Sequence, residues 1–317
     1  MILRNLLVDG RKSVIEIAKE LNLTKEVVQK NCDEMERKGI INGATIHINY
    51  RGFGYKAVAH IMIRVSSSQE DRLLESLKNM PGVYSFYKRG PAGSVDLILT
   101  LKTLQQLDEA KHAIKGQFSV SEMKTAIWTD VKEMHENLEI VPCELAKNSD
   151  IIGQVKKKRI ETFSVETVID EIDQKIADEL ANDGRASLAV IARKAGISTN
   201  SARRRYDKLK KNGILKVTIQ IDPIKIGYQA LVVFFAVTSN EDLSSIIEKI
   251  SEIPDIISIM KTSGDYDLQV YSMVKSIEQL LSIQEELEKI RGITKMDMEV
   301  RKMLNKWPTP RQYISTF

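Results

Sequence analysis

The apolar positions in the second half of the chain first follow a helical spacing. Apolar residues from Ile172 to Leu180 recur every fourth position and predict a first helix. The apolar run 188–192 opens a second helix, and Gly196 ends it. Ser198 is a favourable N-cap for a third helix over 199–212. Three short helices with a glycine turn between the last two predict a helix-turn-helix domain.

The pattern then changes from helices to strands. Residues 230–237 form a continuous apolar run rich in strand-forming residues, which predicts a buried strand. A helix, two strands around a Gly264-Asp265 turn, another helix and a last strand follow, so the predicted order is βαββαβ, the ferredoxin-like split motif. The predicted ranges are 230–237, 241–251, 256–261, 266–273, 275–290 and 293–302.

The first half of the chain repeats this order. Asp9-Gly10-Arg11 returns as Asp183-Gly184-Arg185, and Met80-Pro81 returns as Ile253-Pro254 at nearly the same separation along the chain. Solenoid repeats have much shorter periods, so this separation indicates a duplicated two-part module. The predicted strands and helices of the first βαββαβ unit are 56–65, 69–79, 83–89, 95–101, 103–116 and 121–132.

The predicted fold class is α+β. It comprises two winged-type, three-helix helix-turn-helix domains and two ferredoxin-like βαββαβ domains of the dimeric α/β-barrel type, in tandem. The predicted segments are 1–43, 44–146, a linker over 147–168, 169–216 and 217–317. We call residues 1–146 copy one and residues 169–317 copy two.

Two features of this organisation leave alternatives open. The basic run Lys156–Arg159 in the linker is typical of a solvated tether, and a weaker alternative is an extra phosphate contact. The first helix of copy one lacks about two turns, because Ile2 aligns with Ile176. Either this copy is eroded or the start at Met1 is assigned too late.

Composition narrows the class of protein. The 317 residues are 43% hydrophobic and 28% charged, as in an ordinary soluble globular protein. No apolar run approaches the length of a membrane span, and the first residues do not resemble a secretory signal. The two cysteines, Cys32 and Cys143, have no metal-like spacing, which fits a reducing cytoplasm. We therefore expect a cytoplasmic protein, and a net charge of +4 permits a nucleic-acid partner.

The distribution of charge separates the two copies. Residues 198–216 carry seven basic side chains against Asp207, a balance of +6, whereas the aligned residues 24–42 carry four of each sign. A helix that enters the major groove needs donors for phosphates and base edges, and a small or polar first turn. A solvated basic face is the alternative. The candidate DNA-binding residues are Ser198, Thr199, Asn200, Ser201, Arg203, Arg204, Arg205 and Lys208.

At this point the sequence resembles a known family. It is similar to the Lrp/AsnC, or leucine-responsive (feast/famine), transcriptional regulators over nearly the whole chain, twice. In copy two the resemblance rests on Ile172-Asp173, Asp183-Gly184-Arg185, 191–198, Arg203-Arg204-Arg205, Asn212-Gly213-Ile214 and Ile226-Gly227-Tyr228. In copy one it rests on Asp9-Gly10-Arg11, 17–24 and 38–41. The resemblance implies DNA binding by the helix-turn-helix, and oligomerisation and often binding of amino acids or related effectors by the βαββαβ (RAM) domain.

The resemblance also implies an effector region at the turn before the third strand. Copy two has Gly264, Asp265, Tyr266 and Asp267 there, close to the family's Gly-x-Tyr-Asp pattern. Either aspartate can accept hydrogen bonds from an ammonium group. The turn of copy one, residues 89–96, is two residues longer. A plain β-turn is the alternative for both copies.

We therefore expect a sequence-specific DNA-binding regulator that is not an enzyme and that uses no cofactor or metal. The expected partners are double-stranded DNA, a small amino-acid-like effector, and either further copies of the chain or an intramolecular pseudo-dimer. The four histidines do not have the spacing of metal ligands or of a catalytic triad. His60 lies in an apolar predicted strand, so we expect it to pack in the core. One alternative is an enzyme resembling sirohaem decarboxylases of the same fold. Another is an assembly or effector-sensing protein with only weak, non-specific DNA binding.

Overall fold

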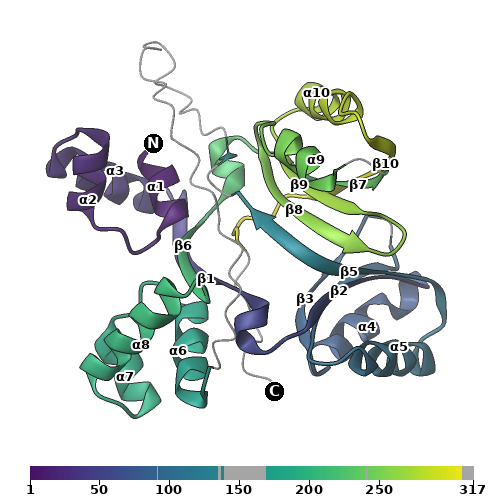
Figure 1. Cartoon of the computed structure of the whole chain (residues 1–317), viewed down its shortest axis with the longest axis horizontal. Helices are drawn as coiled ribbons and strands as arrows, with labels where there is room; N and C mark the ends of the chain where they lie inside the picture. Colours follow the sequence, from purple (N-terminus) through teal and green to yellow (C-terminus); the bar gives the residue numbers. More distant parts are fainter. Residues whose placement is uncertain (91, 135–136, 139–168, 240–241, 309–317) are drawn as a thin grey trace.

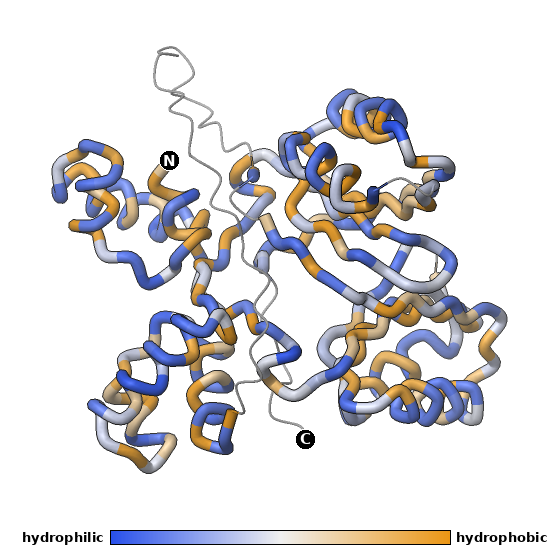
Figure 2. The backbone as a smooth tube through the Cα atoms, viewed as in Figure 1, coloured by the Kyte–Doolittle hydropathy of each residue, from blue (hydrophilic) through white to orange (hydrophobic). Residues whose placement is uncertain are grey.

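Two helical domains lie on one side of the molecule and two sheet-containing domains on the other (Figure 1). The computed structural model describes residues 1–90, 92–134, 137–138, 169–239 and 242–308. The predicted linker and Cys143 lie outside these residues. Hydrophobic residues concentrate in the strands and alternate with hydrophilic residues along the helices (Figure 2). Among the described residues, no helix is long and apolar enough to cross a bilayer.

The three helices predicted for each helix-turn-helix domain are present. They are α1 (Ile2–Val8), α2 (Val14–Leu21) and α3 (Lys25–Arg37) in copy one, and α6 (Glu171–Asn182), α7 (Leu188–Ala195) and α8 (Thr199–Lys211) in copy two. Gly196 ends α7 in the left-handed region with φ of 71°, and the Ser198 side chain caps α8 by accepting from the Ser201 N–H. α1 has 7 residues against 12 in α6, in line with the shorter first helix predicted for copy one.

Each βαββαβ unit has the predicted order. Copy one contains β2 (Ala57–Val65), α4 (Glu70–Leu77), β3 (Val83–Lys88), β4 (Ser94–Leu101), α5 (Gln105–Gln117) and β5 (Val120–Glu133). Copy two contains β7 (Ala230–Thr238), α9 (Leu243–Ile250), β8 (Ile256–Ser263), β9 (Leu268–Val274), α10 (Ile277–Glu288) and β10 (Ile293–Lys302). The βαββαβ prediction is confirmed in both copies.

The two units join in one eight-stranded sheet within the single chain. Its order is β10-β7-β9-β8-β5-β2-β4-β3, and the junction is the antiparallel pair β5–β8, in which Trp128 lies opposite Thr262. The strands lie between α4 and α5 on one side and α9 and α10 on the other (Figure 1). Of the pairings left open by the sequence, this structure shows the intramolecular pseudo-dimer.

A second, two-stranded sheet connects the copies, and it was missing from the sequence prediction. β1 (Ile41–Ile48) pairs antiparallel with β6 (Leu215–Ile221), with Thr45 opposite Thr218. β6 alternates apolar and polar residues from Leu215 to Ile221, a strand pattern that the sequence prediction did not use, and the polar side chains as well as the apolar ones are mostly buried. Two short 3₁₀ turns, Tyr50–Phe53 and Pro223–Ile226, follow them.

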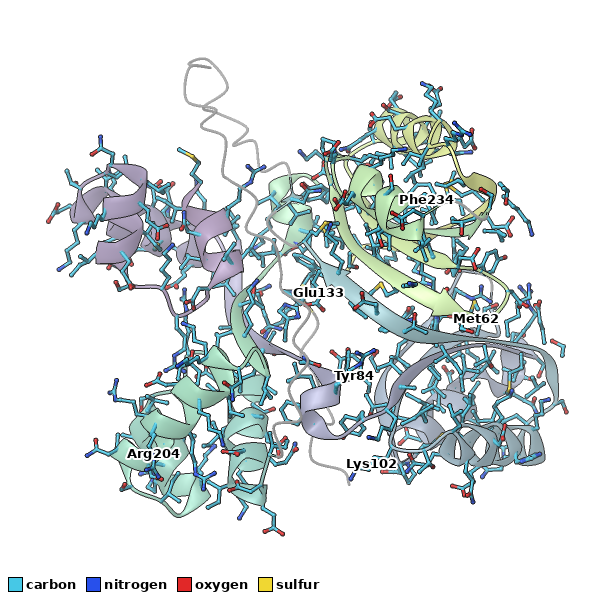
Figure 3. The ribbon with its side chains drawn as sticks, viewed as in Figure 1. Met62, Tyr84, Lys102, Glu133, Arg204 and Phe234 are labelled. Carbon is cyan, nitrogen blue, oxygen red and sulfur yellow. The ribbon has the colours of Figure 1, made fainter. Side chains whose placement is uncertain are left out.

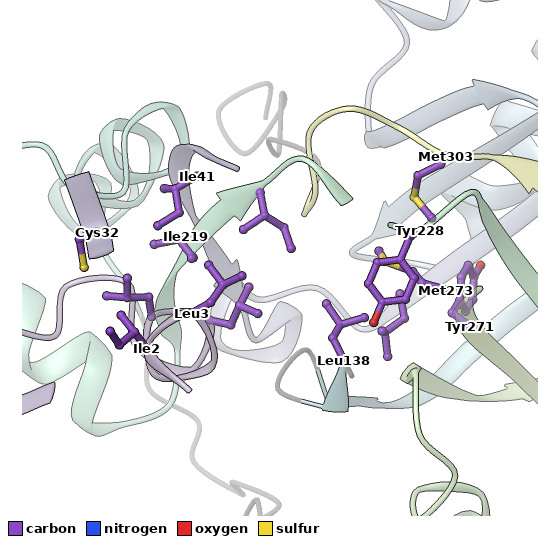
Figure 4. Close-up of a cluster of buried hydrophobic side chains, with 14 of the residues drawn as sticks. Ile2, Leu3, Cys32, Ile41, Leu138, Ile219, Tyr228, Tyr271, Met273 and Met303 are labelled. Carbon is purple, nitrogen blue, oxygen red and sulfur yellow. The ribbon is translucent and has the colours of Figure 1, made fainter. Parts of the chain in front are cut away.

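Each helix-turn-helix domain packs on the strand of the other copy. A hydrophobic cluster runs from α1 and α3 through Ile219 of β6 to the inner face of the copy-two sheet (Figure 4). A separate cluster joins α6–α8 to Ile46 and Ile48 of β1. The cores of the helical domains are thus completed by the opposite copy.

The duplicated Asp-Gly-Arg turns form the hydrogen bonds that hold each helix-turn-helix domain against the strand of the other copy. The Gly10 N–H donates to the Val217 carbonyl, and the Gly184 N–H donates to the Ala44 carbonyl, both at 2.9 Å. Arg11 donates to the carbonyl of Gly184 at 3.0 Å, and Arg185 donates to that of Gly10 at 2.9 Å. The Asp-Gly-Arg sequence therefore occurs in both copies at positions where it makes the same contacts with the opposite copy.

Candidate nucleic-acid interface

One face of α8 holds the helix in place and the other faces solvent. Ala202, Tyr206 and Leu209 are buried, and the last two belong to the cluster shared with α6 and α7. The spacing of these residues leaves the opposite face of α8 outward. Six of the eight candidate residues are exposed, namely Ser198, which also caps the helix, Thr199, Asn200, Arg203, Arg204 and Lys208.

The exposed cations of α8 are available to a ligand. Within the described residues, the ion pairs of α8 use Arg205 and Lys210, and not Arg203, Arg204 or Lys208. Arg204 lies on the second helix-turn-helix domain, across the molecule from the eight-stranded sheet (Figure 3). The N-terminal turn of α8 carries small polar residues, so a duplex can approach its N–H groups closely.

Arg205 requires a correction, because the structure gives it a different role. Its guanidinium donates to Asp170 at 2.7 Å and to Asp173 at 2.8 Å, which ties α8 to the first turn of α6. The Asp173 side chain is only 5% exposed. These hydrogen bonds raise the pKa of Arg205. We therefore assign Arg205 to positioning of α8.

Replacement of Arg205 by alanine is expected to destabilise copy two by about 1–2 kcal/mol, since it leaves the nearly buried Asp173 carboxylate without its partner. The measurement is the urea midpoint of the full chain. The matched control is Asn31→Ala at the duplicated position of α3, where the Asn31 amide only reaches the Val27 carbonyl. Equal midpoints for the two variants would contradict the positioning role.

The same contact is expected to respond to acid. The backbone N–H of Asp173 and the Arg205 guanidinium lower the pKa of Asp170 in the folded state. Its stabilising contribution is therefore complete above the unfolded-state pKa of about 3.9 and is lost as the pH falls through the lower folded value. An acid titration of the full chain followed by circular dichroism should show this loss reduced in the Arg205→Ala variant.

The third helix of copy one presents a different surface at the same positions. Glu26 and Val27 stand where copy two has Asn200 and Ser201, and both are exposed. Gln29, which stands where copy two has Arg203, donates to Asp33 of its own helix at 2.7 Å. The copies therefore differ in chemistry while sharing the helix-turn-helix geometry.

The structure separates the four predicted effector residues. Asp267 accepts from the Thr238 N–H at 2.7 Å, so its carboxylate fixes the end of β7. Gly264 has φ of 148°, and a Cβ there would lie 2.8 Å from the Thr125 carbonyl oxygen of copy one. Asp265 is exposed. Tyr266 faces a cavity, and its hydroxyl donates to Asp297 at 2.6 Å.

That cavity has a volume of about 320 Å³ and lies between the two βαββαβ units. Sequence reasoning missed it, because its lining comes from several separate strands of both copies. The lining residues are Met62, Arg64, Arg89, Gly90, Glu122, Lys124, Phe235, Tyr266, Asp297, Met298 and Glu299. Burial raises the pKa of Tyr266 to about 12, and the hydrogen bond to Asp297 adds to this effect.

His60, predicted to be a core residue, is fully buried, but its neighbours are polar. Its Nδ1 lies 3.2 Å from Gln269 Oε1 and its Nε2 lies 3.2 Å from Asp96 Oδ2. His60 does not line the cavity. The described residues contain no cluster of histidine, cysteine, aspartate or glutamate that could hold a metal ion.

Comparison with solved structures identifies a protein with the same fold over nearly the whole chain. The siroheme decarboxylase NirDL matches 98% of this chain and 94% of its own, with a TM-score of 0.62 and 13% sequence identity. At this identity the match shows a shared fold alone. It therefore supports the tandem architecture, and it does not bear on the reaction.

Family models and relatives match the individual copies. An AsnC-type helix-turn-helix domain matches residues 169–210, an Lrp/AsnC ligand binding domain matches 231–301, and a winged helix-turn-helix DNA-binding domain matches 1–42. The HTH-type transcriptional regulator FL11 of Pyrococcus horikoshii is 32% identical over 126 residues, 39% of this chain and 83% of the relative. The HTH-type transcriptional regulator LrpA of the same organism is 33% identical over 131 residues, 41% of this chain and 93% of the relative. The chain therefore belongs to the Lrp/AsnC family, of which it carries two fused copies.

Proposed function

We propose that the chain is a sequence-specific DNA-binding transcriptional regulator of the cytoplasm, associated with the nucleoid, that reads DNA mainly with α8. The family match and the relatives' names as HTH-type transcriptional regulators support this proposal. In the proposed complex, α8 enters the major groove with its N-terminal turn toward the bases. Asn200, Ser201, Arg203 and Arg204 contact base edges, and Lys208 contacts a phosphate.

The observation that carries the proposal is the exposed, cationic outer face of α8. Arg203, Arg204 and Lys208 are exposed on a helix whose other side is anchored in the domain core. The corresponding face of α3 is electrically neutral. The proposed operator is therefore asymmetric, because the two heads of the pseudo-dimer contribute unequally.

Binding to DNA is expected to weaken steeply with salt. Each phosphate contact lowers the slope of log K against log salt concentration by about 0.9. Lys208→Ala should therefore flatten the slope by about one, with little change in preference among sequences. Fluorescence anisotropy of the full chain on DNA fragments selected from random sequence provides the measurement.

The control for this experiment is Lys30→Ala in α3, which should leave the slope unchanged. Binding that shows no sequence preference would overturn the proposal in favour of an assembly or effector-sensing protein. An absorbance titration with a tetrapyrrole tests the alternative function. Tight binding of the tetrapyrrole together with absent DNA binding would favour a decarboxylase.

We further propose that the βαββαβ domains bind a small amino-acid-like effector and assemble chains into oligomers. The match of residues 231–301 to a ligand binding domain supports the first part. Of the predicted effector residues, Tyr266 has the position best suited to a ligand, since it lines the cavity between the copies.

A further inference from the structure

The two βαββαβ units meet along two equivalent seams, and backbone hydrogen bonds close only one of them. The seam between β5 and β8 is an antiparallel ladder with Trp128 opposite Thr262. The duplication makes β10 the counterpart of β5 and β3 the counterpart of β8, because each holds the same place in the βαββαβ order. β10 and β3 are instead the two ends of the sheet, and no ladder among the described residues joins them.

Two arginines stand on the second seam at the positions where the first seam has its ladder. In the register of the sheet, Arg301 of β10 is the counterpart of Trp128. Arg89, directly after β3, is the counterpart of Thr262. Arg89 donates across the seam to Glu299 of β10 at 3.1 Å. The second seam is therefore bridged by charged side chains where the first has paired backbone.

The bridge is a ring of four charges, two from each copy. Asp96 of β4 is fully buried, lies 3.3 Å from Arg89 and accepts a hydrogen bond from Arg301 at 2.6 Å. Glu299 accepts from Arg301 at 2.8 Å as well as from Arg89. Arg301 also donates to the Tyr87 hydroxyl of β3. Each carboxylate therefore stands between two arginines that would otherwise repel one another across the seam.

The ring depends on ionised carboxylates. Burial alone raises the pKa of Asp96, but the neighbouring His60, Arg301 and Arg89 lower it below its ordinary value. Removal of one member of such a buried set leaves its partners unpaired, which favours separation of the two strands. The β5–β8 seam does not share this dependence, because its backbone hydrogen bonds survive the loss of a side chain.

The strand on one side of the second seam continues to the sheet between the helix-turn-helix domains. We call residues 303–308, which follow β10, the C-terminal strap. Met303 is buried in the cluster of Figure 4. Asn42 of β1 donates to the strap backbone at 2.8 Å, and Trp307 exchanges two backbone hydrogen bonds with Ile221 of β6. The strap thus joins the seam to both strands of the sheet on which the helix-turn-helix domains pack.

We propose that the β10–β3 seam is a latch that opens while the β5–β8 seam stays paired, and that the C-terminal strap transmits its state to the helix-turn-helix domains. The closed latch holds the strap and the two-stranded sheet in one arrangement, and opening releases both. The latch itself rests on the geometry of the sheet. Its effect on DNA rests on the proposed function.

Hydrogen exchange of the full chain without DNA tests the latch, because amide exchange reports local opening. In Arg89→Ala, the amides of β10, β3 and the strap should exchange about tenfold faster or more, with β5 and β8 unchanged. Glu299→Gln, which breaks the ring from the other copy, should give the same pattern. The matched control is Thr262→Ala at the counterpart of Arg89, which should leave both seams unchanged.

A double-mutant cycle on DNA affinity tests the strap. Arg89→Ala alone should weaken binding to a selected DNA site by about fivefold or more. In a chain that already carries Trp307→Ala, which detaches the strap from β6, the same change should have less than about a twofold further effect. Arg72→Ala, on the exposed face of α4, should bind DNA as the unaltered chain does.

Two results would overturn the inference. Faster exchange in all eight strands of Arg89→Ala, or in none, would remove the latch. Additive effects of Arg89→Ala and Trp307→Ala on DNA affinity would remove the role of the strap. A chain with the selective exchange pattern but without sequence preference for DNA would contradict the proposed function and not the latch. In that case the strap is judged by β1 and β6, whose exchange must also rise in Arg89→Ala.

Discussion

Replacing both Arg203 and Arg204 by alanine is expected to weaken binding to a selected DNA site by about 30-fold or more. Both side chains are exposed on the outer face of α8, where α8 would meet the major groove. A good arginine contact to a base is worth about 1–3 kcal/mol, so two lost contacts multiply to at least this factor. Fluorescence anisotropy at fixed salt measures the loss, and circular dichroism confirms that the fold is retained.

The chain supplies its own control for this prediction. Gln29→Ala combined with Lys30→Ala changes the two duplicated positions on α3, and it should lower the affinity by less than about threefold. Such a difference between equivalent surfaces separates a reading helix from general electrostatic attraction. If both double variants lost affinity to the same extent, copy one would also read DNA and the asymmetric operator would be wrong.

The elements of the fold that could be predicted are those specified by local signals. Ser198 and Gly196 mark the ends of the helices around the turn through their capping chemistry, and the structure has both caps. The strand at 230–237 is an uninterrupted apolar run, and it forms β7. These signals need no knowledge of what lies across the fold, which explains why the βαββαβ order was correct in both copies.

The features that sequence reasoning missed depend on partners distant in the chain. β1 and β6 pair although the first βαββαβ unit and the second helix-turn-helix domain lie between them in the sequence, so the alternation of apolar and polar residues in β6 could indicate a strand but not its partner. Arg205 looked like part of a basic cluster, but its partners Asp170 and Asp173 lie at the start of α6, with all of α7 in between. The cavity assembles from strands of both copies. The pattern of residues along the chain does not show which distant segments come into contact in the fold.

The predicted DNA-binding residues therefore lie together on one surface, whereas the predicted effector residues do not. Most of the α8 candidates occupy one exposed face, because a single helix places them by its own periodicity. The effector candidates share one turn, yet only Tyr266 lines the cavity. Neighbouring residues of a turn point in different directions, so adjacency in sequence did not predict a common site.

Gly184→Ala is expected to destabilise the chain by about 3 kcal/mol, through the contact between copies. A Cβ at this position would lie 2.8 Å from the Thr45 nitrogen and 2.9 Å from its oxygen, and both are backbone atoms of β1 that cannot turn aside. The strand and the Asp-Gly-Arg turn must therefore separate. That movement also weakens the Gly184 hydrogen bond to Ala44 and the Arg11 hydrogen bond to the Gly184 carbonyl. The thermal midpoint of the full chain, followed by circular dichroism, reports the loss.

Gly116→Ala serves as the matched control, because Gly116 lies within α5 and a Cβ there would meet nothing within 4 Å. Alanine favours a helix over glycine by up to about 1 kcal/mol, so this variant should be as stable as the unaltered chain or more stable. Gly10→Ala should resemble Gly184→Ala, since its Cβ would lie 2.7 Å from the Thr218 carbonyl carbon of β6. Should all three alanine variants melt together, the duplicated turn would not be a contact between copies, and the exchange of helical domains across the two-stranded sheet would be refuted.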